Sequence, residues 1–395
     1  MQYKFSKKIS SLKPSAIREI LKATSNPNII PFAAGNPAPE AFPITQINEI
    51  ISDILKNEPI NALQYSITDG YPQLITKIKS MLKSDYNIGT GDDELLIVSG
   101  AQQGIELACK CLCDEGDAII CETPSFIGSL NSFRSFNAKL IGVPVEEDGM
   151  NIQLLKNALE NNKNVKMIYI ISNFQNPSGI TTSLEKRKEI YSLAKKHDVV
   201  VIEDNPYGDL NFTKEFIPAI KTFDNNGNVL YCGSFSKTIA PGLRVGFVCA
   251  NKEIIAKMTV AKQGEDVHTN ILAQMAVYNF MEKYDYKAHL EKLREIYKNK
   301  ADLMLNGIKT HFPKEVKVTI PKGGLFIWCT LPENCDMLEF CSVAVKKGVA
   351  VVPGNAFMPN AEDKTTSFRM NFSTPTDEKI VKGIEILGEI LKSFI

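Results

Sequence analysis

The sequence predicts an α/β protein: a large domain with a mainly parallel seven-stranded sheet between helices, and a smaller α+β domain. Between residues 95 and 250, short apolar runs alternate with stretches of helical periodicity, which is the pattern of a parallel sheet wrapped by helices. Most of these runs are continuous and β-branched, as expected when helices cover both faces of a sheet. After about residue 280, a long, charged, periodic helix pattern and several short strand patterns replace the alternation.

Each strand of the large sheet is predicted from one apolar run. The seven runs are Leu95–Ser99, Ala118–Cys121, Leu140–Val145, Val165–Ile171, Val199–Glu203, Val229–Gly233 and Arg244–Ala250. Periodicity predicts helices at 17–21, 44–56, 72–83, 183–197, 286–310 and 376–393, and one that follows residue 100. The strands of the smaller domain are predicted at Val316–Ile320, Phe326–Thr330, Val349–Val352 and Ser367–Phe372.

The chain has 395 residues, which is more than one compact core usually holds. We place the domain boundaries where the pattern changes. The predicted units are an N-terminal arm at 1–45, the large domain at 46–280 and the small C-terminal domain at 281–395.

Composition excludes several classes of function. The formal net charge is zero, which argues against non-specific binding of nucleic acid. The nine cysteines have no C-x-x-C spacing and the four histidines are scattered, so we expect reduced thiols and no metal centre. The chain shows neither a signal peptide nor a run of about 18 apolar residues, and these absences favour the cytoplasm.

A glycine turn lies between the first strand and its helix, at Gly100-Ala101-Gln102-Gln103-Gly104. The first N–H groups of a helix have no partner within it, so they form a ready site for an anion. Glycine lets a phosphate approach the backbone closely. Alone the signal is weak, because any strand–Gly–helix junction looks similar.

Two carboxylates end another buried strand, in Val199-Val200-Val201-Ile202-Glu203-Asp204-Asn205-Pro206-Tyr207. Ligands of parallel sheets bind beyond the carboxyl ends of the strands. A carboxylate there is poorly placed unless it meets a cation. A protonated pyridine nitrogen is one such cation, whereas a helix cap or a surface turn is the structural alternative.

The sharpest signal is Ser234-Phe235-Ser236-Lys237, which follows a strand and precedes Pro241-Gly242-Leu243-Arg244. A lysine at the mouth of a sheet can form an imine with an aldehyde. The two hydroxyls and the guanidinium suit an attached phosphate dianion. A surface loop with scattered basic residues rarely has this spacing.

Two further segments fit the same site. The turn Asn173-Phe174-Gln175-Asn176-Pro177-Ser178-Gly179 follows the strand Val165–Ile171 and brings an amide to the same sheet edge. Arg369 lies among apolar neighbours in a short strand near the C-terminus. An arginine among apolar neighbours favours a carboxylate, which its planar fork binds with two hydrogen bonds. An exposed arginine on a strand is the structural alternative.

Taken in chain order, the motifs Q-Y-S, G-A-Q-Q-G, N-P-S-G, E-D-N-P-Y, S-F-S-K, P-G-L-R-V-G and S-F-R-M-N-F resemble those of the class I/II aminotransferases. These are pyridoxal 5'-phosphate (PLP) enzymes of fold type I. The similarity is greatest to the aminoadipate/kynurenine aminotransferase branch, which is also related to a domain of MocR-type regulators. It covers the chain from about Ser15 to the end.

The resemblance implies which residues hold the cofactor. Lys237 matches the Schiff-base lysine, and Asp204 matches the carboxylate that pairs with the pyridine nitrogen. Asn176 and Tyr207 match the residues that bind the ring hydroxyl, and Phe126 matches the aromatic that stacks on the ring. The residues that match phosphate ligands are Gly100, Ala101, Gln102, Ser234, Ser236, Arg244 and, reaching the neighbouring subunit, Tyr65. Lys237, Asp204 and Tyr207 are the expected catalytic residues.

The resemblance also implies the substrates' contacts. Arg369 matches the clamp of the substrate α-carboxylate, with Asn176 beside it, and Gly35 lies in the loop of the N-terminal arm that lines the substrate pocket. Arg18 matches a mobile arginine that this branch uses on substrate side chains. Shared sites imply a homodimer, and the substrates are an L-amino acid and a 2-oxo acid, with 2-oxoglutarate as the expected acceptor.

Three departures from the family pattern leave the chemistry intact. Ala101 stands where relatives often have serine, Phe126 where tyrosine is commoner, and Asn205 where a second aspartate is frequent. They bear on substrate preference, for which 2-aminoadipate, aromatic and broad-range amino acids are the candidates. One alternative is a PLP-dependent β-lyase or an aminocyclopropane-carboxylate synthase-like enzyme. The other is a ligand-sensing regulator domain of MocR type, for whose N-terminal DNA-binding domain we see no room.

Overall fold

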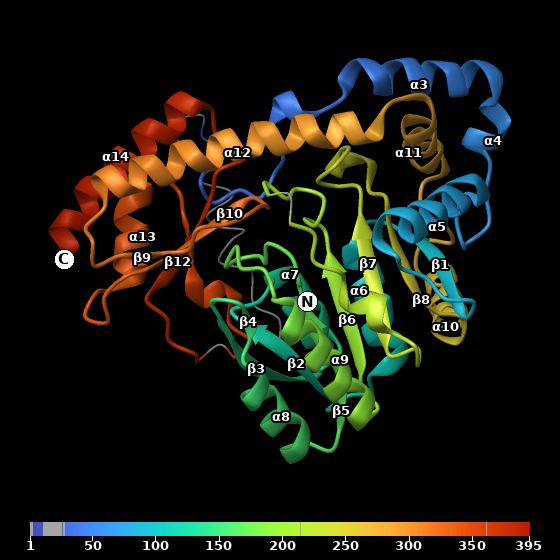
Figure 1. Cartoon of the computed structure of the whole chain (residues 1–395), viewed down its shortest axis with the longest axis horizontal. Coiled ribbons are helices and arrows are strands. Elements are labelled where there is room, and N and C mark those ends of the chain that lie inside the picture. The colour runs from blue at the N-terminus through green and yellow to red at the C-terminus, as the bar shows by residue number, and fades with distance from the viewer. Residues whose placement is uncertain (1–2, 11–25, 27, 214, 361) are drawn as a thin grey trace.

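The computed structural model describes residues 3–10, 26, 28–213, 215–360 and 362–395, which form two sheets with helices around them (Figure 1). The helix predicted at 17–21 lies outside the described residues. No helix in the described part of the chain is both long and apolar enough to cross a membrane. All nine cysteines are free thiols.

The large sheet has eight strands in the order β1-β8-β7-β6-β5-β2-β3-β4. Their bounds are β1 Asp93–Val98, β2 Ala118–Thr123, β3 Lys139–Glu146, β4 Gly149–Met150, β5 Val165–Ile170, β6 Val200–Asn205, β7 Val229–Ser234 and β8 Gly246–Asn251. Seven were predicted, and the eighth, β4, is a two-residue antiparallel addition to β3. The strands β3, β2, β5, β6 and β7 are mutually parallel, so the sheet is mainly parallel as the sequence predicts.

The start of β8 differs from its prediction. The apolar run predicts a strand from Arg244, but β8 begins at Gly246. Arg244 instead has a φ of 54°, in the left-handed region, after the short 3₁₀ helix η3 Pro241–Leu243. β8 runs antiparallel to β7 and β1, so its beginning lies at the edge where the other strands end. Arg244 therefore reaches that edge from the turn before the strand.

Helices cover both faces of this sheet because alternate residues of each strand are buried on opposite sides. Their bounds are α5 Pro72–Tyr86, α6 Ala101–Leu112, α7 Ile127–Ser135, α8 Ile152–Asn161, α9 Leu184–His197, α10 Lys252–Gln263 and α11 Ile271–Lys283. One face packs against α6, α7 and α10. The other packs against α5 and α11 near β1 and β8, and against α8 and α9 near β5.

The second sheet has four strands in the order β11-β12-β10-β9, and all its pairs are antiparallel. These strands are β9 Lys317–Val318, β10 Phe326–Thr330, β11 Val352–Pro353 and β12 Ser367–Asn371, and the helices beside them are α12 Tyr286–His311, α13 Met337–Lys346 and α14 Asp377–Phe394. The strand predicted at Val349–Val352 is mostly wrong, because only Val352 of it lies in β11, while Val349 forms an isolated parallel bridge with Ile30. A segment near the start of the chain thus lies beside the smaller sheet, where the N–H of Asn371 on β12 donates to the carbonyl of Phe32.

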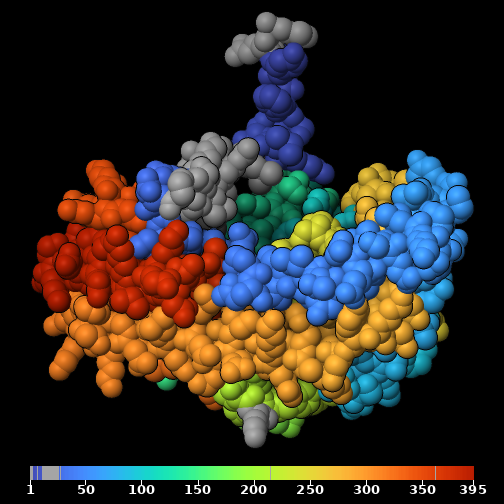
Figure 2. Space-filling view, turned by 90° about the horizontal axis from the view of Figure 1, so that it is seen from above, coloured from blue at the N-terminus to red at the C-terminus, as the bar shows by residue number. Residues whose placement is uncertain are grey.

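Other elements complete the chain: α1 Lys7–Ser10, η1 Pro39–Ala41, α3 Ile44–Asn57, α4 Pro59–Leu63, η2 Ile220–Phe223 and η4 Gly354–Phe357. Figures 1 and 2 show α3 and α4, in blue, beside α11 and the first part of α12, in orange. The O–H of Tyr284 donates to Glu49 on α3 over 2.7 Å. The domain boundaries at residues 45 and 280 stay predictions, although α12 runs from the large sheet's helices to α14 (Figure 1).

Candidate active site

The motif residues gather at one edge of the large sheet. The parallel strands β2, β5, β6 and β7 end there, and so does β1, which runs antiparallel to β8 as β7 does. The turns that follow β1, β5 and β7 carry Gly100, Asn176 and Lys237, and Asp204 lies near the end of β6 itself. β12 of the smaller sheet brings Arg369 to the same place, since Arg369 donates to Asn176.

Lys237 lies in the turn after β7, and its Nζ donates to the carbonyl oxygen of Gly35 over 2.8 Å. Burial lowers the pKa of Lys237 to about 8, and the nearby charges of Arg369 and Arg244 act in the same direction. Among the described residues, no carboxylate forms an ion pair with it. A lysine with a lowered pKa is partly neutral near pH 7.5, and the neutral amine is the nucleophile.

Asp204 lies near the end of β6 and is buried, with 3% of its surface exposed. Its Oδ2 accepts a hydrogen bond from the O–H of Tyr169 over 2.8 Å. Its Oδ1 is also buried and has no partner among the described residues. Burial raises the pKa of Asp204 to about 7. A buried oxygen without a donor is costly, so Oδ1 is placed for an N–H group that the chain itself does not supply.

Arg369 is buried on β12, with its guanidinium over the rings of Phe326 at 4.3 Å and Phe357 at 5.0 Å. Its Nη1 donates to Oδ1 of Asn176 over 2.8 Å, and its Nη2 donates to the carbonyl of Ala33 over 2.9 Å. The Nε has no partner in the described part of the chain. Burial lowers the pKa of Arg369 to about 10.

This guanidinium therefore has only neutral acceptors around it among the described residues. A buried charge is stabilised by an opposite charge with matching geometry. For a guanidinium the best match is a carboxylate held by two parallel hydrogen bonds. The Asn176 amide that accepts from Arg369 also lies 3.5 Å from the Tyr207 oxygen, to which its Nδ2 donates. Asn176 thus links the arginine to the tyrosine.

An anion cradle forms where α6 begins. Gly100 precedes the helix with a φ of 79°, and a Cβ there would lie 2.2 Å from Nη2 of Arg244. That nitrogen donates to the carbonyl of Ser99 over 3.0 Å, and Nη1 donates to Oγ of Ser236 over 3.4 Å. Ser234 accepts from the Ser236 N–H over 3.2 Å. The cradle thus combines a guanidinium, two hydroxyls and the first N–H groups of a helix.

Phe126 is the residue at the N-cap of α7, and its ring lies near Gly128 in the first turn of that helix. A Cβ on Gly128 would come within 2.6 Å of that ring, so a larger residue there would displace it. The Gln102 side chain donates to the carbonyl of Gly128 over 3.2 Å and to Ser132 over 2.8 Å. The side chain therefore ties α6 to α7, a contact that the sequence did not predict.

Tyr65 differs in its surroundings from the other site residues that the structure describes. Tyr65 is 82% exposed, and its ring packs edge-on against His268 with a centroid distance of 6.0 Å. Arg18 lies outside the described residues. The other predicted residues converge, while the role of each stays a prediction.

Comparisons with known proteins agree with this geometry. Residues 27–387 match the family model described as aminotransferase class I and II. Aromatic-amino-acid aminotransferase 1 of Thermococcus litoralis is 38% identical over 392 residues, which are 98% of this chain and 94% of that protein. The chain belongs to the class I and II aminotransferase family.

Two solved structures of this family are similar over nearly the whole chain. The kynurenine aminotransferase of Pyrococcus horikoshii, in complex with PMP, superposes with a TM-score of 0.95 and is 36% identical in sequence. The match covers 98% of this chain and 97% of that protein's chain. The α-aminoadipate aminotransferase of Thermus thermophilus, complexed with N-(5'-phosphopyridoxyl)-L-leucine, has a TM-score of 0.91 and 35% identity, with 99% and 97% covered. These findings favour the aminotransferase over the lyase and regulator alternatives.

The residues of this aminotransferase fit the family's cofactor, PLP, on three structural grounds. The buried Oδ1 of Asp204 lacks a donor, and a pyridinium N–H supplies one. The space beside Gly100 is closed to a Cβ and is lined by donors that suit a phosphate. The Nζ of Lys237 has a lowered pKa, which suits a bond to an aldehyde carbon.

Several buried polar residues of the aminotransferase were missed in the sequence. Arg187 on α9 makes five hydrogen bonds, to the carbonyls of Thr182, Ile217, Pro218 and Ser172 and to the Asn173 side chain. It thereby joins the loops after β5 and β6. Glu122 is buried at the end of β2 and accepts from the Ile171 N–H. A carboxylate at a strand's carboxyl end, the signal used for Asp204, also points to Glu122.

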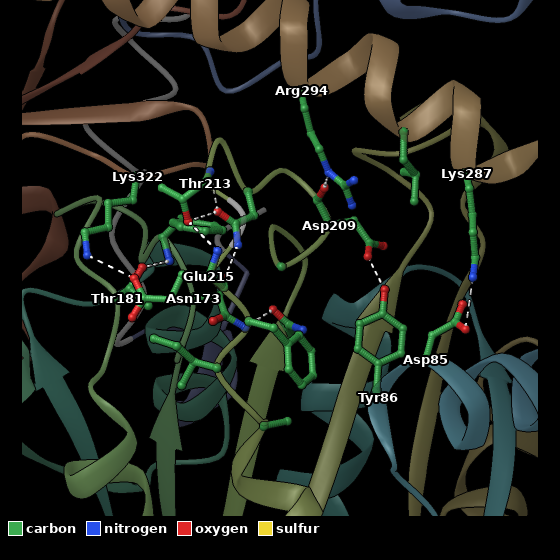
Figure 3. A pocket seen from close by; sticks show the side chains of 18 of the residues that line it. Asp85, Tyr86, Asn173, Thr181, Asp209, Thr213, Glu215, Lys287, Arg294 and Lys322 are labelled. Carbon is green, nitrogen blue, oxygen red and sulfur yellow. Dashed lines mark hydrogen bonds and ion pairs between the residues drawn. The ribbon is translucent and has the colours of Figure 1, made fainter.

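A cavity of about 560 Å³ lies between α12 and the ends of the strands (Figure 3). Asn205 lines it, whereas Asp204 points to the opposite face because successive strand side chains alternate. Two ion pairs lie around the cavity, Lys287 with Asp85 at 3.3 Å and Lys322 with Glu215 at 3.3 Å. Two hydrogen bonds reach Asp209. The Nε of Arg294 donates to its carbonyl over 2.8 Å, and the O–H of Tyr86 donates to its carboxylate. The two contacts of Asp209 tie α5 and α12 to the loop at 206–213, which carries Tyr207.

Proposed function

We propose that the aminotransferase binds PLP at the sheet edge, with Asp204 at the ring nitrogen and Lys237 joined to the aldehyde carbon. The proposed phosphate ligands are the N–H groups of Ala101 and Gln102, with Gly100, and the side chains of Ser234, Ser236 and Arg244. Asn176 and Tyr207 are proposed for the ring hydroxyl and Phe126 for the ring face. When bound, the cofactor supplies an electrophilic carbon and a ring that withdraws electrons from it.

Lys237 is the proposed general base. Its pKa of about 8 keeps a useful fraction of the amine neutral at neutral pH, which a base requires. The carbonyl of Gly35 accepts from Nζ and holds the side chain at the mouth of the sheet. Once a substrate amine had taken its place, Nζ would be free to receive the substrate α-proton and to deliver it to the carbon that the cofactor's aldehyde supplies, on the other side of the nitrogen.

Arg369 is the proposed clamp for the substrate α-carboxylate. Its Nε lacks a partner among the described residues, and its two other nitrogens bind neutral acceptors that are weaker partners than a carboxylate. The rings of Phe326 and Phe357 hold the plane of the guanidinium. This side chain therefore orients an amino acid or a 2-oxo acid toward Lys237. It serves both half-reactions, because both substrates carry the same carboxylate.

The proposed reaction moves an amino group from an L-amino acid to a 2-oxo acid in two half-reactions, with 2-oxoglutarate as the acceptor. Support for the donor class comes from the relatives, whose printed names are aromatic-amino-acid, kynurenine and α-aminoadipate aminotransferases. We propose aromatic amino acids, kynurenine and 2-aminoadipate as donors. Gly35 is proposed to line the substrate pocket, and Arg18 to contact the donor's side chain.

We propose that the active unit is a homodimer in which Tyr65 reaches the partner's phosphate. Tyr65 is exposed, and so are Ile60 at 74% and Leu63 at 72% beside it. A run of exposed large apolar residues is typical of a protein interface. Mixed dimers test this arrangement. A Lys237→Ala subunit paired with a Tyr65→Ala subunit regains one complete site if Tyr65 acts across the interface. If Tyr65 acts within its own subunit, no site is complete and no activity returns.

The observation that carries the proposal is that a half-buried Lys237 and a buried Arg369 lie at the same site, and neither has a carboxylate partner among the described residues. The experiment screens amino donors against 2-oxoglutarate and follows the absorbance of bound cofactor. We expect the donor to change the spectrum without acceptor, and the acceptor to restore it. Lys237→Ala loses both effects, whereas the control Lys287→Ala keeps them. Product formed continuously without any 2-oxo acid would establish a lyase instead.

A further inference from the structure

The two carboxylate oxygens of Asp204 have different surroundings. Oδ2 accepts from Tyr169, while Oδ1 is buried without a donor among the described residues. Under the proposed function, Oδ1 is the oxygen left for the cofactor ring. The described chain therefore donates one hydrogen bond to the carboxylate, from the O–H of Tyr169, and the second oxygen remains available to the ligand.

The fold places Tyr169 for this contact. Tyr169 on β5 is paired with Ile202 on the parallel strand β6. Asp204 lies two residues beyond Ile202, so its side chain is on the same face of the sheet. Tyr169 is fully buried, and the ring of Phe133 packs against it edge-on with a centroid distance of 5.4 Å and an interplanar angle of 72°. The ring is thus held by packing, and its hydroxyl reaches Asp204 across one strand spacing.

The surroundings of Asp204 disfavour its charge. Burial raises the pKa of Asp204, and the hydrogen bond from Tyr169 opposes that rise. Burial raises the pKa of the Glu122 carboxyl group, and the charge on Asp204 adds to that rise. The thiol of Cys232, on the neighbouring strand β7, is buried too. The Tyr169 O–H is therefore the contact of the described chain that favours the carboxylate form.

We propose that Tyr169 is a positioning residue that keeps Asp204 ionised and turns its free oxygen toward the ring nitrogen of the cofactor. The inference rests on the proposed function, since it requires the cofactor ring to meet Asp204. Tyr169 itself touches neither cofactor nor substrate. Removing its hydroxyl leaves the carboxylate with no donor from the described chain, so the hold on a pyridinium N–H weakens.

The variant Tyr169→Phe removes the hydroxyl and keeps the ring that packs on Phe133. A hydrogen bond to a charged group contributes enough that its loss weakens the dependent interaction by about 10-fold or more. We therefore expect the variant to bind PLP about 10-fold more weakly than the wild type. The matched control is Tyr191→Phe on α9, which removes a hydroxyl bonded to Asn225, away from Asp204.

The decisive comparison uses 1-deazapyridoxal 5'-phosphate, in which carbon replaces the ring nitrogen. Equilibrium dialysis gives the dissociation constants of both cofactors for the wild type, Tyr169→Phe and Tyr191→Phe. The proposal predicts that Tyr169→Phe weakens binding of PLP but leaves binding of the deaza compound within about two-fold of wild type. Tyr191→Phe should change neither.

Equal losses for the two cofactors would show that Tyr169 supports the site only through packing, and would overturn the proposal. No loss for either would overturn it as well. Urea unfolding of the apo proteins confirms that each variant is folded before the comparison. Failure of the proposed function looks different, since the wild type itself would then bind no PLP. A wild type that binds and transaminates, with Tyr169→Phe unchanged, contradicts this inference alone.

Discussion

Asp204→Asn is expected to stabilise the protein without its cofactor, although it removes a group proposed for catalysis. Burial raises the pKa of Asp204 from its ordinary 3.8 to about 7 in the folded chain. Each pH unit between the folded and unfolded pKa values is worth about 1.4 kcal/mol. The ionised carboxylate therefore costs the folded state about 4 kcal/mol at neutral pH, and a neutral amide of the same shape avoids that cost.

The pH dependence of the unfolding free energy follows from the raised pKa of Asp204. Below about pH 4 the carboxyl group is protonated in both states and contributes nothing. Between 3.8 and about 7, the unfolded chain loses its proton first, so the wild type loses stability as the pH rises. Above about pH 7 the full cost is present. The advantage of Asp204→Asn should thus be small near pH 4.5 and approach about 4 kcal/mol near pH 8.

Urea unfolding of the apo proteins at these two pH values, at one fixed protein concentration, measures the difference. Asp224→Asn is a control of opposite sign. Although burial acts to raise the pKa of Asp224, hydrogen bonds from Lys221 and backbone N–H groups keep it below its ordinary value. That variant should lose stability at the higher pH. An Asp204→Asn protein that is no more stable, or equally more stable at both pH values, would refute the reasoning.

Three other substitutions follow from the geometry. Arg369→Lys keeps the charge but loses the planar fork, so kcat/KM for the amino donor should fall about 10- to 100-fold. The dissociation constant for PLP should stay unchanged. An equal loss in PLP binding would contradict the assigned role. Gly100→Ala adds a Cβ 2.2 Å from Nη2 of Arg244, and its φ of 79° strains the backbone of an alanine by about 1–2 kcal/mol. The variant should weaken PLP binding, measured by dialysis, at least about 10-fold. Unchanged binding would show that the phosphate binds elsewhere. Arg187→Met removes the arginine's hydrogen bonds to four carbonyls, of which that of Ser172 keeps the Thr182 N–H. The variant should lower the free energy of unfolding by at least about 3 kcal/mol, which unfolding in urea would detect.

The sequence predicted the site's location because strand ends are readable from pattern. Parallel strands end at one edge, so the residues after each apolar run must lie close together. Gly100, Asp204 and Lys237 are placed by this rule alone. Arg244 was predicted within a strand, but a left-handed turn before the strand brings it to the cradle. The motif correctly indicated Arg244 as a site residue, but the pattern of apolar residues predicted the wrong backbone conformation for it.

What the sequence did not predict depends on contacts between distant segments. Val349 pairs with Ile30, and no local pattern reveals a partner so far away in the chain. Tyr169 looked like one apolar residue of a strand, because its contact with Asp204 depends on the register of β5 and β6. Arg187 looked like one charge on an amphipathic helix, yet it is fully buried. Register and burial are products of the whole fold.

Lys237 as the residue that carries PLP is the centre of the account, and reduction with borohydride tests it most directly. The treatment fixes the cofactor permanently to the lysine that holds it, and mass spectrometry of the digested protein then identifies that lysine. We predict that the phosphopyridoxyl group is found on the peptide with Lys237 and is absent from the Lys237→Ala protein. A modification on another lysine, or the same modification in the Lys237→Ala protein, would contradict the account.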